Sequence, residues 1–507
     1  MLASHQVAFF LLETDAADPA RRAAAVKGLA HAPGHADQLA ALTGDPAPQV
    51  RAAVAMGLGK QGEEAPVEPL LALCSDPDAE VRRRAVNALV RLGATGPAVV
   101  EALARRLGDA SLRNRVLVLD RLRRFEEPVA AKALMPLLSA PDTDPGLWAS
   151  AASLLRLLPE ADAVLADLVR TAPAEIRRRA LDMLASPQAG IPGMRPDAEP
   201  EEQEAAWRRL WNSEPRVAEA LLAALEAETD PHARGRLFDA LAAHHAPEAV
   251  APAAAWLSDP GCGPSAAAAL AAAGTVEAVE VLRRAAARRR RRGSILHSAV
   301  IRGLGTAGDA SDAASLLVLL DDRSASVRLA AVTGLGAFFQ RFDGSLHGRL
   351  ERWRAERLPG LPVPPPDDDP AVRELARQAA EQLTHMLVHD ADQADTYHDA
   401  LWHIPEVRPL LRPLLRNPDG RVRSTALHLA ERFGELDFIG RLRALNDPDH
   451  AVRQGAALSC LQLARQGELT PDERNALRTQ LQRSQDDPDH YVRTFTAKAL
   501  KHLNRAA

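Results

Sequence analysis

The chain of 507 residues is 47% hydrophobic but only 4% aromatic, and its formal net charge is −5. This length exceeds the usual size of one compact hydrophobic core. The slightly acidic charge gives no general argument for a nucleic-acid partner. The first residues lack the positive region of a secretion signal, and the apolar run 7–12 is too short to span a membrane, so we expect a cytoplasmic protein that does not enter membranes.

One helix-starting pattern recurs along the chain and predicts its architecture. In its clearest copy, Asp76-Pro77 precedes Val81, Arg82 and Leu89, with the apolar residues at helical spacing. Further copies begin at Asp45, Asn417, Asp447 and Asp487, a variant begins at Asp322, and a shortened copy begins at Asp369. We expect the aspartate to cap the helix and the proline to lie in its first turn. Periods of about 30 to 40 residues indicate stacked supersecondary units.

Two interruptions divide the predicted repeats into three blocks. Helical repeats are expected over residues 1–185, 205–339 and 370–507. Residues 186–204 combine prolines with an acidic cluster, which predicts an irregular loop. Residues 340–369 include a proline-rich segment that favours extended polyproline II structure. No stretch alternates β-branched and polar residues, so we expect essentially no sheet.

The repeated residues resemble the HEAT-repeat family, in particular the short bacterial repeats of the phycobilin-lyase type. This resemblance implies an all-α fold, an α-solenoid of stacked antiparallel helix pairs. It implies helix caps at Asp45, Asp76, Asp447 and Asp487. It also implies a polar ladder between repeats, formed by the arginines that follow the inward valine or its equivalent: Arg51, Arg82, Arg328, Arg423, Arg453 and Arg493.

No motif in the sequence designates a catalytic centre. Residues 57–62 and 303–308 match a dinucleotide-binding glycine pattern, but a helix precedes each, so we interpret these glycines as helix ends. Neither a Gly-x-Ser-x-Gly elbow nor a Cys–His pair stands out. We therefore predict a protein that is not an enzyme, with no catalytic residue, cofactor or metal site assigned.

Two clusters are candidate partner contacts. The first is the basic run Arg288, Arg289, Arg290, Arg291 and Arg292, which could grip phosphates or an acidic protein surface, or could be a solvated helix end. The second is the pair His385 and His389, four residues apart on a predicted helix. These histidines could share a metal ion with a nearby carboxylate, or could belong to a polar helix end.

The predicted function is that of a scaffold, adaptor or assembly factor that binds a protein partner on a concave surface. The two interruptions and residues 385–403 are where we expect specificity to reside. One alternative, from the resemblance, is a bilin lyase or chaperone that holds a tetrapyrrole for attachment to an acceptor protein. Another is a HEAT-like DNA-binding protein or glycosylase, which the acidic charge disfavours. The sequence leaves the oligomeric state open.

Overall fold

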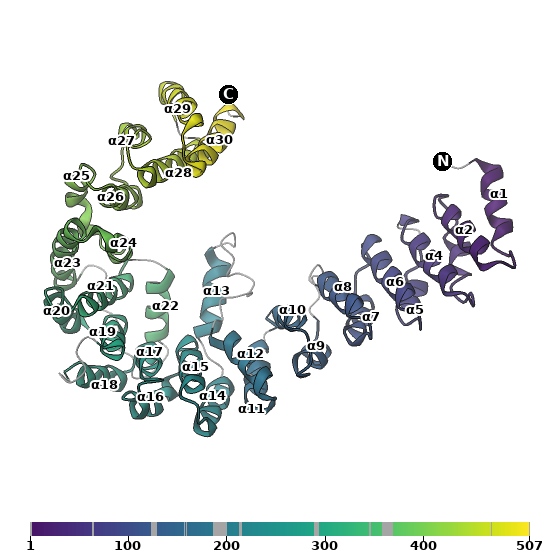
Figure 1. The fold of residues 1–507 in the computed structure, drawn as a ribbon, viewed down its shortest axis with the longest axis horizontal. Helices are drawn as coiled ribbons and strands as arrows, with labels where there is room; N and C mark the ends of the chain where they lie inside the picture. The colour runs from purple at the N-terminus through teal and green to yellow at the C-terminus, as the bar shows by residue number, and fades with distance from the viewer. Residues whose placement is uncertain are drawn as a thin grey trace. The chain divides into compact units, whose positions relative to one another are not determined.

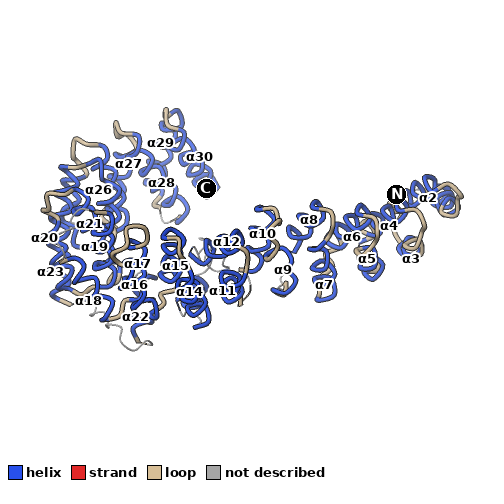
Figure 2. The backbone as a smooth tube through the Cα atoms, turned by 60° about the horizontal axis from the view of Figure 1, so that its bottom comes forward, coloured by secondary structure: helices blue, strands red, loops and turns tan. Residues whose placement is uncertain are grey.

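The computed structural model describes residues 3–62, 65–122, 129–156, 158, 160–185, 200–211, 215–287, 294–343, 346–356, 369–467 and 469–505. Within these residues the chain forms helices and no β-strand (Figure 2), which confirms the all-α prediction. The chain divides into two compact units. Unit 1 comprises Met1–Ala206 with Glu214–Ala224, and unit 2 comprises Trp207–Ser213 with Leu225–Ala507.

Unit 1 is a stack of antiparallel helix pairs (Figure 1). The second helix of each pair packs on the second helix of the next, so that α2, α4, α6, α8 and α10 form one continuous layer. The helices of this unit are α1 (Ser4–Glu13), α2 (Pro19–Leu29), α3 (Ala36–Ala40), α4 (Pro48–Leu58), α5 (Val67–Leu73), α6 (Ala79–Arg91), α7 (Pro97–Arg105), α8 (Leu112–Leu122), α9 (Ala131–Leu138), α10 (Pro145–Leu155), α11 (Ala161–Thr171) and α12 (Ala174–Ala185), with a 3₁₀ turn, η2 (Arg106–Gly108), after α7. Two more helices, α13 (Pro200–Trp211) and α14 (Pro215–Ala227), cross the division between the units.

Unit 2 continues the same construction in a curved stack (Figure 1). Its inner layer, on the concave side of the curve, consists of α15 (Pro231–Ala243), α17 (Gly263–Ala273), α19 (Ile295–Ala307), α21 (Ala325–Gln340), α24 (Ala394–Leu401), α26 (Gly420–Arg432), α28 (His450–Gln466) and α30 (His490–Arg505). Its outer layer consists of α16 (Val250–Trp256), α18 (Val276–Ala286), α20 (Ala310–Leu319), α23 (Pro370–His389), α25 (Leu411–Leu414), α27 (Phe438–Ala444) and α29 (Pro471–Arg483). The extra helix α22 (Leu346–Ala355) belongs to neither layer, and short 3₁₀ turns occur at η3 (Pro247–Ala249), η5 (Ala391–Gln393), η6 (Pro405–Leu410) and η7 (Ser484–Asp486).

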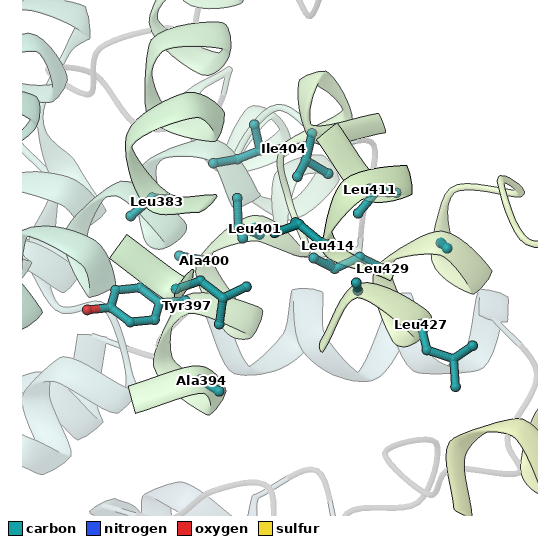
Figure 3. Packing of buried hydrophobic residues seen from close by; sticks show 14 of the residues in the cluster. Leu383, Ala394, Tyr397, Ala400, Leu401, Ile404, Leu411, Leu414, Leu427 and Leu429 are labelled. Carbon is teal, nitrogen blue, oxygen red and sulfur yellow. The ribbon is translucent and has the colours of Figure 1, made fainter. Parts of the chain in front are cut away.

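Each repeat buries a narrow apolar stripe of small and aliphatic side chains. In α6 the fully buried residues Val81, Ala85 and Leu89 recur at helical spacing and face the neighbouring helices. Figure 3 shows the same packing in unit 2, where Leu401 of α24 lies among leucines of the adjoining α23, α25 and α26. Alanine, leucine and valine dominate this core, as the low aromatic content requires. Small side chains let the helices stack closely.

The glycines that resemble a dinucleotide-binding pattern serve this close stacking. Gly303 and Gly305 lie inside α19 and not at its end, which corrects our interpretation of this pair. A Cβ atom added to Gly305 would lie 2.0 Å from the carbonyl oxygen of Gly334 in α21. Only a residue without a side chain fits where two helix backbones touch.

The first predicted interruption is shorter than expected. Helix α13 begins at Pro200, so residues 200–204 are helical and were wrongly assigned to an irregular loop. Proline is compatible with the first turn of a helix, where its missing N–H has no partner to lose, and acidic residues favour the same turn. The remainder of that predicted loop, 186–199, and the proline-rich segment, 357–368, lie outside the described residues.

Candidate functional site

Successive repeats are joined by arginines that each hold two turns at once. The Nη1 of Arg51 donates to the carbonyl oxygens of Asp45 (2.7 Å) and Pro46 (3.2 Å) in its own repeat. Its Nε and Nη2 donate to the two carboxylate oxygens of Asp76 in the next repeat, at 2.6 and 2.9 Å. The same contact, which we call a rung, recurs at Arg22–Asp45, Arg82–Asp109, Arg423–Asp447 and Arg453–Asp487. The planar guanidinium matches the carboxylate with two parallel hydrogen bonds.

The helix-cap prediction is wrong, because the observed N-cap lies two residues after the predicted aspartate. The N-cap of α6 is Asp78, whose carboxylate accepts from the N–H groups of Glu80 and Val81, whereas Asp76 stands earlier in the turn. Asp76 accepts the N–H of Asp78 at 2.8 Å and the arginine of the preceding repeat. The other predicted caps behave like Asp76 and serve as rung acceptors: Asp45, Asp447 and Asp487. The physical reason is that the Asp-Pro pair forms the turn before the helix, so its carboxylate faces the preceding repeat.

The rung carboxylates stay ionised although they are largely covered. Burial by itself would raise the pKa of Asp109, but hydrogen bonds from Arg82, from the Ser111 N–H and from Asn114 outweigh it and lower that pKa. The pKa values of the other acceptors are also lowered. Each rung is therefore a charge pair at neutral pH that joins the turns of two neighbouring repeats.

Two of the predicted ladder arginines make only half of a rung. The Nη1 of Arg328 donates to the carbonyl oxygen of Asp322 at 2.9 Å, and that of Arg493 donates to Asp487 at 2.6 Å. Among the described residues, neither arginine has a carboxylate within ion-pair distance. Arg328 is half-buried. It lies on α21, on which α24 of the next repeat packs, and its charge lowers the pKa of Tyr397 in part, against the larger effect of burial, which raises it.

A second set of polar contacts, which the sequence did not predict, lies at the C-terminal ends of the helices that stack from repeat to repeat. In unit 1, Gln61 donates to the carbonyl oxygen of Ala32 at 3.1 Å, just beyond α2. In unit 2, Arg341 donates to Gly308, the residue that ends α19, at 2.6 Å. The buried Arg354 of α22 donates to the carbonyl oxygens of His245 and Ala273, both at 2.9 Å. These donors satisfy C-terminal carbonyl groups. They follow no repeated motif, so the sequence offered no signal for them.

Of the two predicted partner contacts, only the histidine pair lies within the described residues. The run Arg288, Arg289, Arg290, Arg291 and Arg292 lies outside the described residues. His385 and His389 are exposed on α23 in the outer layer, with ring centroids 4.3 Å apart. His403, which follows them in sequence, instead pairs with Asp343 at 2.6 Å. Among the described residues, no group of three or more His, Cys, Asp or Glu side chains could hold a metal ion.

An aromatic and basic cluster lies instead on inner-layer helices α24 and α26. We call His398, Trp402, His428 and Arg432 the inner patch. The ring centroids of His398 lie 5.2 Å from Trp402 and 5.9 Å from His428, and the guanidinium of Arg432 lies 5.4 Å from the Trp402 ring. His428 and Arg432 are exposed, while His398 and Trp402 are half-buried. His398 and Trp402 lie in the segment 385–403, where the sequence analysis expected specificity, whereas His428 and Arg432 lie outside it.

Neighbouring groups shape the electrostatics of the inner patch. The pKa of His428 is lowered, chiefly because surrounding atoms displace water from part of its ring, and further because His398 is a like charge. One turn along α26, Glu431 accepts a hydrogen bond from Ser459 of α28 at 2.6 Å and pairs with Arg441 at 3.2 Å. This carboxylate is thus engaged within the stack, whereas the Arg432 side chain beside the Trp402 ring is exposed. The patch can offer an aromatic face and a positive charge to a bound molecule.

Helix pairs stacked through charged rungs define this protein as an α-solenoid. Residues 7–74, 36–116 and 67–155 match the family described as HEAT repeats, so this part of the chain consists of HEAT repeats. The match supports the general family and not the phycobilin-lyase type. No curated protein matches the sequence.

Among solved structures, the chain is similar to importin beta and to a karyopherin. A crystal structure of importin beta is 13% identical, with a TM-score of 0.43, and the match covers 99% of this chain and 80% of that chain. The karyopherin Kap121p bound to the SUMO protease Ulp1p is 11% identical, with a TM-score of 0.41, and the match covers 99% and 69% of the two chains. Among the described residues, no helix is long and apolar enough to cross a membrane.

Proposed function

We propose that this protein is a non-catalytic scaffold or adaptor that binds a protein partner on the inner layer of unit 2, with the inner patch as the main contact. Solenoids of this kind expose extended concave surfaces that commonly bind other proteins. The observation that supports this proposal most directly is that the exposed Arg432 lies beside the half-buried Trp402 on the inner layer. Tryptophan and arginine are the residues that most often dominate the affinity of protein interfaces.

The contrast with the rest of the stack supports this choice of surface. The arginines of the five rungs form ion pairs with aspartates of the next repeat, so their positive charges are neutralised within the fold. Arg432 lies in the last turn of α26, and its guanidinium lies 5.4 Å from the ring of Trp402. A partner that places a carboxylate against Arg432 and an apolar side chain against Trp402 fits this chemistry.

The test compares partner capture by the full-length protein and by two tryptophan variants. Trp402→Ala removes the aromatic ring of the inner patch. Trp256→Ala is the matched control, because Trp256 is also partly exposed and stacks against an arginine, Arg234 at 3.7 Å, but belongs to the outer-layer helix α16. Proteins captured from the native host should be lost with Trp402→Ala and retained with Trp256→Ala. With the purified partner, Trp402→Ala should weaken binding about tenfold or more.

The outcomes distinguish the scaffold from the other functions suggested by the sequence. An unchanged set of captured proteins with Trp402→Ala overturns the placement of the binding surface. Visible absorbance that co-purifies with the protein favours a bound tetrapyrrole. A salt-dependent mobility shift with duplex DNA favours nucleic-acid binding.

A further inference from the structure

Three neighbouring helices of the inner layer, α26, α28 and α30, carry almost no negative charge. Their sequences hold a single acidic residue, Glu431, which is engaged with Ser459 and Arg441 inside the stack. Exposed carboxylates are found at Asp399 on the neighbouring helix α24 and at Glu435 in the turn after α26. The acid-free surface is therefore confined to these three helices.

Each of the three helices has an exposed cation that lacks a carboxylate partner. Within the part of the chain that the structure describes, no acidic oxygen lies within ion-pair distance of Arg432, Arg465 or Lys498. On α23, by contrast, the exposed Arg377 pairs with Glu374 on its own helix at 2.7 Å. The charges on α26, α28 and α30 are thus available to carboxylates of a bound molecule.

These cations share one face of the layer with an exposed leucine. His428, Leu458 and Lys498 occupy the same position relative to the inward valine of their helices. His428 and Leu458 remain exposed although α28 and α30 pack beside their helices, so this position faces solvent within the stack. Helical spacing places Arg432 on the face of His428, and Arg465 on the face of Leu458. We call Arg432, Leu458, Arg465 and Lys498 the inner strip.

We propose that the inner patch and the inner strip together bind an extended acidic segment of a partner protein, which crosses α24, α26, α28 and α30. This proposal rests on the proposed function and specifies the chemistry of the partner. Carboxylates of the segment face the cations of the inner strip, because complementary charge selects the partner and orients it. Apolar side chains of the segment face Trp402 and Leu458.

The spacing of the helices sets the spacing of the partner residues. Packed helices lie about 9 Å apart, and an extended chain advances about 3.3 Å per residue. One step between neighbouring inner helices therefore takes about three residues. Across the layer the segment meets Trp402, Arg432, Leu458 and Lys498 in turn, one on each helix. We expect about ten residues, with an apolar residue midway between two acidic residues that are about six apart.

A single-stranded nucleic acid is also polyanionic, but it fits this surface less well. Its bases stack on aromatic rings, and its backbone carries a phosphate at every nucleotide. The middle of the strip instead holds the aliphatic Leu458, which is 38% exposed. A leucine at this place favours a segment that alternates acidic and apolar side chains, and thus a polypeptide.

The test selects ligands from displayed random peptides of about twelve residues, long enough to cross the four helices. The peptides are panned on the immobilised full-length protein, and the most enriched one is then synthesised with a fluorescent label. We expect enriched sequences that contain two acidic residues about six apart with an apolar residue midway. A random-sequence single-stranded oligonucleotide is assayed in parallel by fluorescence anisotropy.

Substitutions in the strip show where the labelled peptide binds. Lys498→Gln and Arg465→Gln should each weaken binding about threefold to fivefold. Leu458→Glu should weaken it about tenfold or more, because it places a like charge against the acidic segment. The matched control is Arg483→Gln, which removes an exposed cation from the outer-layer helix α29 and should leave binding unchanged. All four side chains are exposed, so the variants should unfold at the same temperature as the parent protein.

The proposal is overturned if no peptide is enriched, if the enriched peptides lack carboxylates, or if Lys498→Gln and Arg483→Gln weaken binding equally. Binding of the oligonucleotide without enrichment of acidic peptides also overturns it, in favour of a nucleic acid. Capture of host proteins with Trp402→Ala judges the proposed function separately. Loss of that capture, together with enriched peptides that are not acidic, would overturn the acidic segment and leave the scaffold standing.

Discussion

Removal of one buried rung should open unit 1 locally, and Arg82→Ala is the sharpest test. The Arg82 and Asp109 side chains are 11% and 0% exposed, and Nε lies 2.5 Å from the carboxylate. Deleting one partner of a buried ion pair costs about 3 to 5 kcal/mol, because the other charge stays buried without compensation. Asp109 keeps its bond from the Ser111 N–H, so we expect the lower end, about 3 kcal/mol.

The matched control is Arg84→Ala on the same helix. Arg84 also pairs with a carboxylate, that of Glu80, but the two side chains are 41% and 46% exposed. Such a surface pair is worth about 0.5 kcal/mol or less.

Native-state hydrogen exchange measures both variants. Solenoid repeats open locally, so a single melting temperature of the whole chain is a poor readout. A loss of about 3 kcal/mol speeds exchange at the α6–α8 junction roughly 100-fold. The reasoning is refuted if Arg82→Ala and Arg84→Ala change the exchange at this junction by the same factor.

Three further predictions follow from the rungs and the close helix contacts. Asp78→Ala should lower the free energy of unfolding by about 1 kcal/mol through the lost helix cap. Asp76→Ala should lower it by about 2 to 3 kcal/mol, because Arg51 then loses its carboxylate partner. Equal losses in urea unfolding would contradict the separate roles of the two aspartates. Gly305→Ala should destabilise unit 2 by about 3 kcal/mol through the clash with Gly334, while Gly44→Ala, with nothing within 4 Å of its added Cβ, should be nearly neutral in thermal unfolding. The lowered pKa values of the rung aspartates contribute stability that is fully present above their ordinary pKa of about 4 and is lost as the pH falls through the lower folded values. Stability should thus be flat from pH 7 to about 5 and fall below about 4, and a loss already complete at pH 5 would contradict this assignment.

The repeat itself was predictable because its signals are local. A helix start, an inward valine and a period of about 30 residues together specify a stacked hairpin. The cap assignment failed because Asp76 and Asp78 are both good capping residues, and choosing between them requires the backbone of the turn. The copy at Asp369 shows the same limit: Asp369 caps α23, which belongs to the outer layer, whereas the caps Asp78 and Asp449 begin helices on which successive repeats stack.

The candidate site could not be found from local patterns. Trp402 and His398 are four residues apart, but His428 and Arg432 join them only because α24 packs on α26. The pair His385 and His389, four residues apart, gave the stronger sequence signal, but it lies exposed on α23 in the outer layer. Proximity along one helix is readable from sequence, whereas proximity between repeats depends on how the hairpins stack.

The inner patch lies where the series of rungs is interrupted. Within the described residues the last complete rung before this region is Arg82–Asp109 in unit 1. In unit 2, Arg328 makes only half of a rung, and the next complete rung starts at Arg423 on α26. The hairpin α23–α24 between them is held by apolar packing around Tyr397 and Leu401. A repeat whose stacking does not depend on the charged motif can vary its sequence without losing its neighbours. We therefore expect a binding surface to arise at this break, because the positions outside the rung pattern are the ones that the fold leaves open to other roles.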